Sequence, residues 1–409
     1  MSRMATVEEG NEIALAGWTR SIKRSALQDM LVAASRPGVL SFALGLPAAE
    51  LFPAADYSES VARVLATDSR ALQYSPPFRP LKQHIVSLMA LRGVECREEQ
   101  VFLTAGAQQG VNLLARLLLE AGSKVVVEEM AYTGCQQVLQ ASQADILTVP
   151  TDFRTGIDVE AVERLLEGGE RPALLYVVPD GHNPLAVSMS LEKRVRLAEL
   201  ARAFQVPVVE DDAYGFLYYE SPLPPLRAFE DRWVFYVGTF SKIMAPALRT
   251  GWVVVPESLT PHLAVIKEAS DIDMATLSQR AISAYLDAGH LPAHLDNLRQ
   301  EYRRRRDAML GALRTHLPAG ARWETPTAGL FIWVELPEGV DTGELLKAAI
   351  ETEQVAFIPG HAFCVGDGYR APNRMRLNFS NSSVERIEDG VRRLARALNN
   401  VYPRAFRGA

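Results

Sequence analysis

The chain has 409 residues, a length that allows two or three domains with sizeable hydrophobic cores. Its hydrophobic content of 48% and charged content of 22% are ordinary for a soluble globular protein. The formal net charge of −6 gives no support for a nucleic-acid-binding surface. The basic run 303–306 lies in a helical pattern that also carries Glu301 and Asp307, so we interpret it as a solvated or subunit-facing stripe.

Cysteine usage and the N-terminal sequence indicate the compartment. Cys96, Cys135 and Cys364 are widely spaced and odd in number, which argues against a disulfide framework or a metal site and fits a reducing compartment. The N-terminus carries Glu8 and Glu9 and lacks the apolar core of a signal peptide, and no apolar run reaches membrane-spanning length. We therefore expect a cytoplasmic protein that binds neither a membrane nor nucleic acid.

The first hundred residues alternate helical patterns with loops. Little periodicity over 1–17 predicts a loose arm, and apolar residues at helical spacing predict a helix over 18–35. A short strand-like run follows and ends in a loop at Gly45. Further helices are predicted over 56–66 and 81–92, and the three prolines of LQYSPPFRPLKQ between them indicate an exposed loop.

The next segment is predicted to be a strand, a tight turn, a helix and a second strand. A β-rich run meets the turn from Thr104 to Gln108, a long amphipathic helix follows, and the strand Lys124–Val127 ends the unit. Backbone N–H groups at such a helix start form a ready anion site. Taken alone, the turn is equally compatible with a simple reversal of the chain.

Strands and helices keep alternating further along the chain. Strands are predicted at 146–149, 173–178, 206–209, 234–237 and 250–255, and helices at 159–166 and 191–204. This alternation predicts an α/β fold with a mainly parallel sheet, helices on both faces and ligands at the carboxyl ends of the strands. The turns PDGHNP, EDDAYG and TFSK all follow predicted strands, so they are expected to meet at one edge of the sheet.

The last third of the chain has a different pattern of predicted helices and strands. A long helical region over 259–317 leads to the strands GLFIWVEL, VAFIP and RMRLNFS, with helices predicted over 342–352 and 384–398. This pattern indicates a smaller α+β domain that packs with the N-terminal helix. The predicted units are an N-terminal arm and helix over 1–50, a large domain over 51–300 and a small C-terminal domain over 301–409.

The stretch VGTFSKIMAPALRTG contains the strongest chemical signal. Lys242 follows Thr239 and Ser241, has apolar neighbours, and is followed by Arg249. A desolvated lysine near another cation loses its proton readily, so its amine can form a Schiff base with a carbonyl group. Hydroxyls and a guanidinium suit a phosphate. Pyridoxal 5′-phosphate carries both an aldehyde and a phosphate, and it is held by a lysine and by an acid that faces its ring nitrogen. The alternative is a surface lysine before a turn.

Two residues near the end of a predicted strand suit the ring of this cofactor. Asp211 ends an apolar strand, where a carboxylate can hold the ring nitrogen protonated. Its neighbours Glu210 and Asp212 leave open that it is only a polar helix cap. Tyr214 can donate a hydrogen bond to the phenolic oxygen of the ring.

Three further residues are candidates, each with an alternative reading. Asn183 can also contact the phenolic oxygen, although Asn-Pro on its own is only a turn signal. Tyr132 can stack on the ring or belong to the core. Arg376 lies in a predicted strand with Arg374 two residues before it, and its planar fork suits an α-carboxylate. The alternative for Arg376 is a charge on an edge strand.

Assembled, these residues resemble a fold-type-I pyridoxal-phosphate aminotransferase of class I/II. The resemblance is strongest to the branch that contains α-aminoadipate and kynurenine aminotransferases and the aminotransferase-like half of MocR-type regulators. It extends from about residue 18 to the C-terminal helix. It rests on motifs that occur in the family's order: SFALGLPAAELFP, LQYSP, TAGAQQG, PDGHNP, EDDAYG, TFSKIMAPALRTGW and RLNFSN. The implied fold is a seven-stranded sheet covered by helices plus a smaller α+β domain.

The resemblance also implies a role for each site residue. Lys242 forms the Schiff base and then acts as base and acid of the proton shift, and Asp211 faces the pyridine nitrogen. Tyr214 and Asn183 contact the phenolic oxygen, and Arg376 binds the substrate carboxylate. The remaining cofactor contacts are implied for Gly106, Ala107, Gln108, Thr239, Ser241 and Arg249, which bind phosphate, and for Tyr132, which stacks on the ring.

Some implications concern the partner subunit and the substrate side of the site. Tyr74 is implied to reach the phosphate of the partner subunit, so the enzyme is expected to be a homodimer with shared active sites. Leu44 and Gly45, with Asn183, are expected on the substrate side, and the family usually has two glycines where this chain has Leu44-Gly45. Relatives often read Q-N-P-T-G where this chain reads HNPLA. These departures leave the substrate open.

We predict an aminotransferase that exchanges an amino group between an α-amino acid and a 2-oxo acid by a ping-pong route. One alternative keeps the cofactor and changes the outcome to that of a lyase, decarboxylase or oxidase, because protein groups decide which bond breaks. Another is a ligand-sensing module like the effector half of a MocR regulator. The lack of a basic DNA-binding segment before residue 18 argues against that module.

Overall fold

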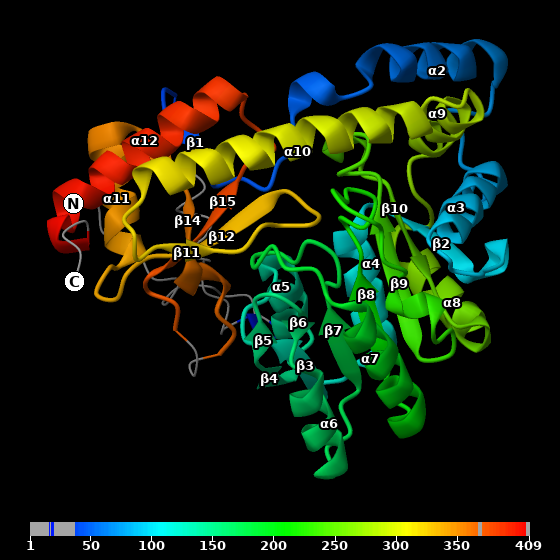
Figure 1. Cartoon of the computed structure of the whole chain (residues 1–409). Coiled ribbons are helices and arrows are strands. Elements are labelled where there is room, and N and C mark those ends of the chain that lie inside the picture. Colours follow the sequence, from blue (N-terminus) through cyan, green and yellow to red (C-terminus); the bar gives the residue numbers. More distant parts are fainter. Residues whose placement is uncertain (1–15, 17, 20–36, 367–369, 406–409) are drawn as a thin grey trace, which may run out of the picture.

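The computed structural model describes residues 16, 18–19, 37–366 and 370–405. The arm predicted over 1–17 and the helix predicted over 18–35 lie almost entirely outside these residues. The described residues form a larger part around one sheet and a smaller part around another, with a long helix running along both (Figure 1).

A seven-stranded sheet forms the centre of the larger part. Its strands, in spatial order, are β2 (Val101–Thr104), β10 (Gly251–Val254), β9 (Val234–Thr239), β8 (Val208–Asp211), β7 (Leu174–Val177), β3 (Lys124–Glu128) and β4 (Asp145–Val149). Strand β10 runs antiparallel to both neighbours, and the other adjacent pairs are parallel. The connection from β9 to β10 is a loop too short for a parallel crossover, which explains the one reversed strand. The predicted mainly parallel sheet is confirmed.

Helices cover both faces of this sheet. One face packs against α4 (Ala107–Leu118), α5 (Thr133–Ala141) and α8 (Thr260–Asp271), and the other against α6 (Val159–Glu167) and α7 (Leu191–Phe204). Alternate residues of β3 enter the two cores, Val125 and Val127 on the first face and Val126 on the second. Burial on both sides is why the strands read as continuous apolar runs.

The smaller part is built around an antiparallel sheet. Its strands, in order, are β11 (Arg322–Trp323), β12 (Phe331–Glu335), β15 (Arg374–Asn378) and β14 (Ile358–Pro359), and helices α11 (Thr342–Glu353) and α12 (Val384–Val401) accompany it. Strand β1 (Leu40–Ser41) pairs in parallel with β13 (Val355–Ala356), so the segment before Gly45 joins the smaller part. Residues after β1 then lead directly toward the larger sheet.

The remaining α-helices and a short hairpin complete the described fold. They are α2 (Ala54–Thr67), α3 (Arg79–Leu91), α9 (Thr276–Asp287), α10 (Leu291–His316) and the hairpin of β5 (Thr151–Asp152) and β6 (Gly156–Ile157). Helix α10 is the long helix that lies along both parts in Figure 1, and it spans position 300. The domain boundaries at 50 and 300 stay predictions.

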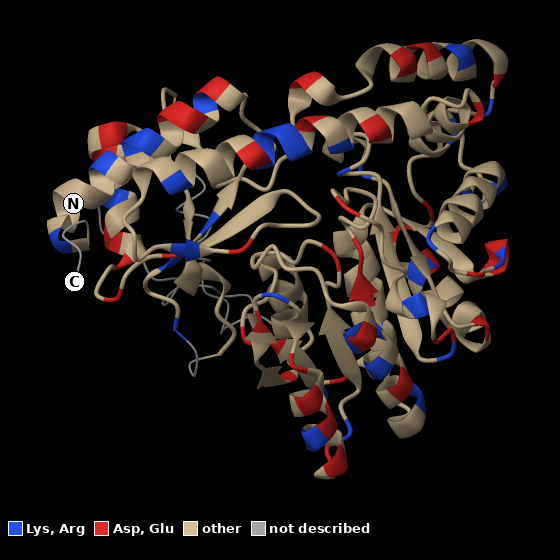
Figure 2. Ribbon diagram, viewed as in Figure 1, with Lys and Arg blue, Asp and Glu red and all other residues tan. Residues whose placement is uncertain are grey.

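The basic run 303–306 on α10 is only partly exposed, in contrast to the interpretation from the sequence. Basic and acidic residues are interspersed along α10 (Figure 2), and Arg303 and Arg304 are exposed. Arg305 and Arg306 are buried instead. Arg305 contacts the carboxylate of Glu301 at 2.7 Å, and Arg306 donates to a backbone carbonyl oxygen. The reading of the whole run as a solvated or subunit-facing stripe is therefore wrong, because successive helix positions face different sides.

The described ranges contain neither a membrane-spanning helix nor a cluster of metal ligands. There, no helix combines the length and apolar character needed to cross a bilayer. In the same residues, no group of three or more His, Cys, Asp or Glu side chains is arranged to hold a metal ion. Cys96, Cys135 and Cys364 are all free thiols.

Candidate active site

A cavity of about 340 Å³ lies where β7, β8 and β9 end. Thirteen predicted residues line it: Leu44, Gly45, Ala107, Gln108, Tyr132, Asn183, Asp211, Tyr214, Thr239, Ser241, Lys242, Arg249 and Arg376. The sequence did not single out the other lining residues, which are Leu46, Thr133, Tyr176, Val178, Ala213, Pro246 and Phe363. Side chains from both parts of the molecule therefore meet in one place.

Lys242 lies in this cavity just after β9 ends. Its Nζ donates a hydrogen bond to the carbonyl oxygen of Gly45 at 2.9 Å. Burial, together with the nearby charges of Arg376 and Arg249, lowers the pKa of Lys242 to about 8, while Asp211 opposes the shift. A larger share of this amine is thus neutral near physiological pH than for a free lysine. The neutral amine is the form that attacks a carbonyl.

Asp211 ends β8 and presents one carboxylate oxygen without a partner. Its Oδ2 accepts a hydrogen bond from the hydroxyl of Tyr176 at 2.7 Å. Its Oδ1 is buried and has no hydrogen-bond partner among the described residues. Burial raises the pKa of Asp211 to about 6, although the bond from Tyr176 opposes the shift. A buried carboxylate oxygen without a donor is costly, so this atom fits a ligand N–H group such as a protonated ring nitrogen.

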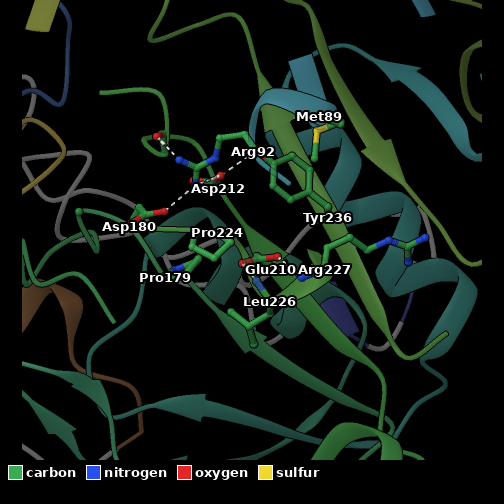
Figure 3. A network of polar contacts seen from close by, with 12 residues as sticks. Met89, Arg92, Pro179, Asp180, Glu210, Asp212, Pro224, Leu226, Arg227 and Tyr236 are labelled. Carbon is green, nitrogen blue, oxygen red and sulfur yellow. Dashed lines mark hydrogen bonds and ion pairs between the residues drawn. The ribbon is translucent and has the colours of Figure 1, made fainter. Parts of the chain in front are cut away.

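The neighbouring residue Glu210, and not Asp211, acts as the polar helix cap. The Glu210 carboxylate accepts hydrogen bonds from the backbone N–H groups of Leu226 and Arg227, at 2.7 and 3.0 Å. These residues open a short 3₁₀ helix, Leu226–Ala228. Figure 3 shows Glu210 beside Leu226 and Arg227, and Glu210 is not among the residues that line the cavity. Glu210 is therefore the polar cap, and Asp211 faces the cavity.

A buried ion-pair network includes Asp212, the residue that follows Asp211 in the chain (Figure 3). Arg92 Nη2 contacts Asp180 Oδ2 at 2.9 Å and Asp212 Oδ2 at 3.2 Å. Arg194 Nη2 contacts the other oxygen of Asp180 at 2.6 Å. The two carboxylates follow the ends of β7 and β8, so the network holds together the two loops that carry site residues. A carboxylate within three residues of the end of each buried strand is the sequence signal that points to this network.

Arg376 belongs to the small sheet and points into the cavity. Its Nη1 donates to Asn183 Oδ1 at 2.5 Å and its Nη2 to the carbonyl oxygen of Ala43 at 2.6 Å. Its buried Nε has no partner among the described residues. The guanidinium lies 4.2 Å from the ring centre of Phe331 and 4.8 Å from that of Phe363. Strand β15 is an inner strand of its sheet, so the edge-strand reading of Arg376 is wrong.

An anion cradle surrounds the start of α4. Gly106 precedes this helix with a φ of 88°, and a Cβ there would lie 2.7 Å from Nη2 of Arg249. Arg249 Nη2 donates to the carbonyl oxygen of Ala105 at 2.8 Å. Thr239 donates its hydroxyl hydrogen to Ser241 Oγ at 3.0 Å. Helix N–H groups, two hydroxyls and one guanidinium at one place fit a phosphate.

Two tyrosines complete the wall of the cavity. Tyr132 precedes α5, and the neighbouring Gln108 Nε2 donates to the carbonyl oxygen of Gly134 at 2.8 Å. Tyr214 is buried and forms a hydrogen bond with Asn183. Burial raises the pKa of both Tyr132 and Tyr214. Both phenols therefore keep their protons and can act as hydrogen-bond donors.

Tyr74 is the one predicted site residue that lies away from this cavity. It is 85% exposed, on the loop between α2 and α3. It lines a separate surface groove together with Leu72, Ile272 and Met274. Within a single chain, Tyr74 is therefore not part of the site.

Comparisons with known proteins agree with this geometry. The family described as aminotransferase class I and II matches residues 48–394. The chain is 36% identical to the 2-aminoadipate transaminase of Thermus thermophilus, covering 93% of this chain and 95% of that protein. It is 34% identical to aromatic-amino-acid aminotransferase 1 of Thermococcus litoralis, covering 92% of both.

A solved structure shares both the fold and the cofactor. The α-aminoadipate aminotransferase of Thermus thermophilus, in complex with N-(5′-phosphopyridoxyl)-L-leucine, matches with a TM-score of 0.86 and 35% identity, covering 95% of this chain and 98% of that one. The fold, the activity and the cofactor predicted from the sequence are confirmed by these matches. The chain therefore belongs to the class I and II aminotransferases and is a pyridoxal-phosphate-dependent enzyme.

Proposed function

We propose that Lys242, Asp211 and Arg376 carry the transamination of an α-amino acid with a 2-oxo acid. The observation that supports this most is their convergence in one cavity from different elements. Lys242 brings an amine of lowered pKa, Asp211 a buried carboxylate oxygen without a donor, and Arg376 a guanidinium with an unused N–H. The amine matches the cofactor aldehyde, the carboxylate oxygen matches the ring nitrogen, and the guanidinium matches the substrate carboxylate.

The roles proposed for the remaining residues follow from their chemistry. Bound pyridoxal phosphate supplies an aldehyde and an electron sink. The phosphate is proposed to be held by Gly106, Ala107, Gln108, Thr239, Ser241 and Arg249. Tyr132 stacks on the ring, while Asn183 and Tyr214 donate hydrogen bonds to its phenolic oxygen. Lys242 takes the proton from the substrate α-carbon and returns it, and Arg376 binds the α-carboxylate. Leu44 and Gly45 line the space for the substrate side chain.

A half-reaction distinguishes transamination from the alternative outcomes. The loaded enzyme, mixed with an amino acid and no acceptor, is expected to release one equivalent of the matching 2-oxo acid per site and then stop. Adding a second 2-oxo acid should restart turnover, as a ping-pong route requires. Release of carbon dioxide, ammonia or hydrogen peroxide without an acceptor would instead indicate a decarboxylase, lyase or oxidase. A panel of amino donors and 2-oxo acids then identifies the substrates.

Arg376→Lys is expected to weaken substrate binding and leave cofactor binding unchanged. Lysine keeps the positive charge but lacks the planar fork that holds a carboxylate through two parallel hydrogen bonds. Losing one charge-assisted hydrogen bond costs about 1.5–3 kcal/mol, so KM should rise at least about tenfold. The measurement is KM for the amino acid and for its 2-oxo partner, alongside the visible spectrum of the loaded enzyme.

Arg374→Lys provides the matched control for this variant. Arg374 lies on the same strand, where its guanidinium contacts the Glu335 carboxylate at 2.8 Å and does not line the cavity. We expect its KM values to stay within about twofold of wild type, because lysine keeps the charge that faces Glu335 and this pair lies outside the cavity. If Arg376→Lys binds substrates as well as Arg374→Lys does, the carboxylate site lies elsewhere.

We also propose a homodimer in which Tyr74 contributes to the phosphate site of the partner. Its exposure supports this, as does that of Leu72 and Ile272, which are 77% and 70% exposed beside the same groove. Large apolar side chains that gather at one exposed place are typical of an interface. A cytoplasmic location is proposed from the three free thiols, which suit a reducing compartment.

Complementation between two inactive chains tests the shared site. Tyr74→Asp should be inactive because its carboxylate repels the phosphate, and Lys242→Ala should be inactive because it lacks the amine. In a mixed dimer, one site carries both defects and the other carries neither. Isolated mixed dimers should therefore regain about half of wild-type activity per dimer, as the two-fold arrangement requires.

A second pair of variants serves as the control. Lys242→Ala mixed with Asp211→Asn combines two defects that both belong to the chain's own cavity. Each site of that mixed dimer retains one defect, so it should stay inactive. If the Tyr74→Asp mixture is as inactive as this control, Tyr74 does not serve the partner subunit.

A further inference from the structure

Tyr176 stands out as a polar side chain in an otherwise apolar strand. Strand β7 reads Leu-Leu-Tyr-Val over residues 174–177, and all four residues are buried. The Tyr176 hydroxyl donates to Asp211 Oδ2 at 2.7 Å, and the residue lines the active-site cavity. Strand β8, which carries Asp211, is paired in parallel with β7, so the two residues belong to adjacent strands of one rigid sheet.

Several other groups face Asp211, and they act on it in a different way. Interactions with Lys242 and His182 favour its ionised form, and the charge of Asp212 opposes it. Cys135 on α5 lies close to the same carboxyl. The neutral phenols of Tyr132 and Tyr214 also lie near it. Among the described residues, Tyr176 is the one that donates a hydrogen bond to the carboxylate.

We propose that Tyr176 is a positioning residue, whose hydroxyl holds one oxygen of Asp211 so that the other is directed at the ring nitrogen of the cofactor. This rests on the proposed role of Asp211. A carboxylate can rotate about its bond to the Cβ atom, and a bond to Oδ2 limits that rotation. The free Oδ1 is then already aligned before the cofactor enters, which reduces the ordering cost of binding.

A second buried tyrosine in the same sheet, Tyr236, forms a similar bond and serves as a control for Tyr176. Tyr236 on β9 donates its hydroxyl hydrogen to Asp212 Oδ2, also at 2.7 Å. Both tyrosines are fully buried in the same sheet, and each bonds a carboxylate at the end of β8. Asp212, however, takes part in the Arg92 network of Figure 3 and does not line the cavity. Tyr176→Phe and Tyr236→Phe therefore remove the same kind of bond at different distances from the proposed chemistry.

The test measures the affinity of the unloaded protein for two ligands. One is pyridoxal phosphate, and the other is its analogue with a C–H group in place of the ring nitrogen. We expect Tyr176→Phe to bind pyridoxal phosphate about tenfold more weakly, the usual effect of a lost hydrogen bond to a charged group. The analogue offers no N–H to Asp211, so its affinity should change less than about twofold. Tyr236→Phe should affect both ligands equally.

The pH dependence gives a second measurement that a purely structural role would not change. The bond from Tyr176 lowers the pKa of Asp211, so its removal should raise that pKa above about 6. On acidification, the affinity for pyridoxal phosphate should then begin to fall at a higher pH in Tyr176→Phe than in wild type. No such displacement is expected in Tyr236→Phe.

Failure of this inference can be told apart from failure of the proposed function. Asp211→Asn should itself lose affinity for pyridoxal phosphate and not for the analogue. If it changes both affinities equally, Asp211 does not face the ring nitrogen. If Asp211→Asn is selective and Tyr176→Phe is not, only the role of Tyr176 is wrong. Should Tyr176→Phe not fold, 4-aminophenylalanine at position 176 keeps a donor and should keep the selectivity. Loss of selectivity in that variant would overturn the inference.

Discussion

Lys242→Ala is expected to abolish the visible absorption of the protonated imine in the loaded enzyme and nearly all of its transaminase activity. Alanine has no amine to bond the cofactor aldehyde or to move the α-proton. A positioned acid–base group alone contributes about 10²–10⁴-fold to a rate, so activity should fall by at least that factor. The checks are the absorption spectrum, before and after treatment with an amino acid, and kcat for the forward reaction.

Lys193→Ala is the matched control for this variant. Lys193 is also half-buried, and its Nζ donates to the carbonyl oxygen of Gly156 at 3.0 Å, but it does not line the cavity. Its spectrum and rate should match wild type. An absorption band that persists in Lys242→Ala and resists amino acids would place the cofactor bond on another lysine.

The lowered pKa of Lys242 also predicts how cofactor uptake depends on pH. A depressed lysine pKa means that the amine loses its proton at a lower pH than a free lysine does. Uptake of pyridoxal phosphate by the unloaded protein should therefore increase as the pH rises through about 8. Stopped-flow absorption at several pH values measures this directly. An increase only above pH 10 would indicate a solvated amine.

Asp211→Asn is expected to slow proton abstraction strongly even when enough cofactor is supplied to saturate its weakened binding. A neutral amide cannot stabilise the protonated ring nitrogen, and losing such a charge-assisted contact costs about 1.5–3 kcal/mol. Single-turnover rates should consequently fall by at least about tenfold at full cofactor occupancy. Near wild-type chemistry in this variant would show that Asp211 is structural only.

Although Asp211→Asn should slow the reaction, it should increase the folding stability of the unloaded protein. Burial raises the pKa of Asp211 to about 6, above its unfolded value, so the folded state holds this proton more tightly. The wild-type protein therefore loses stability from this group as pH rises through about 6. Denaturant unfolding of the unloaded proteins should find the variant more stable than wild type at pH 8, with a smaller gain near pH 5. Asp212→Asn should instead be destabilised at both, because Arg92 loses a buried partner.

The sequence was sufficient to predict the larger sheet and the residues at its carboxyl edge. Strands such as β7 are continuous apolar runs because both faces are covered, and each ends at a turn rich in polar residues. Parallel strands bring those turns to one edge, so Asn183, Asp211 and Lys242 could be grouped by topology alone. The nine-residue helix α5 was not predicted, since its sequence, TGCQQVLQA, contains few apolar residues.

Contacts between residues far apart in the sequence required the tertiary structure. Periodicity shows that Arg376 lies on a strand, but only the packing of the two parts directs it at Asn183 and beneath the ring of Phe331. In the same way, the burial of Arg305 depends on which side of α10 faces the core.

The sequence by itself determined the fold class, the cofactor chemistry and the set of polar groups that serve it, because these depend on local patterns and on strand ends. Only the tertiary structure decided that Glu210 is the cap while Asp211 faces the cavity, and that Tyr176 bonds the latter. Neighbouring carboxylates are equivalent in a sequence. They differ once the strand's alternation directs successive side chains to opposite faces, where one meets backbone N–H groups and the other an open cavity.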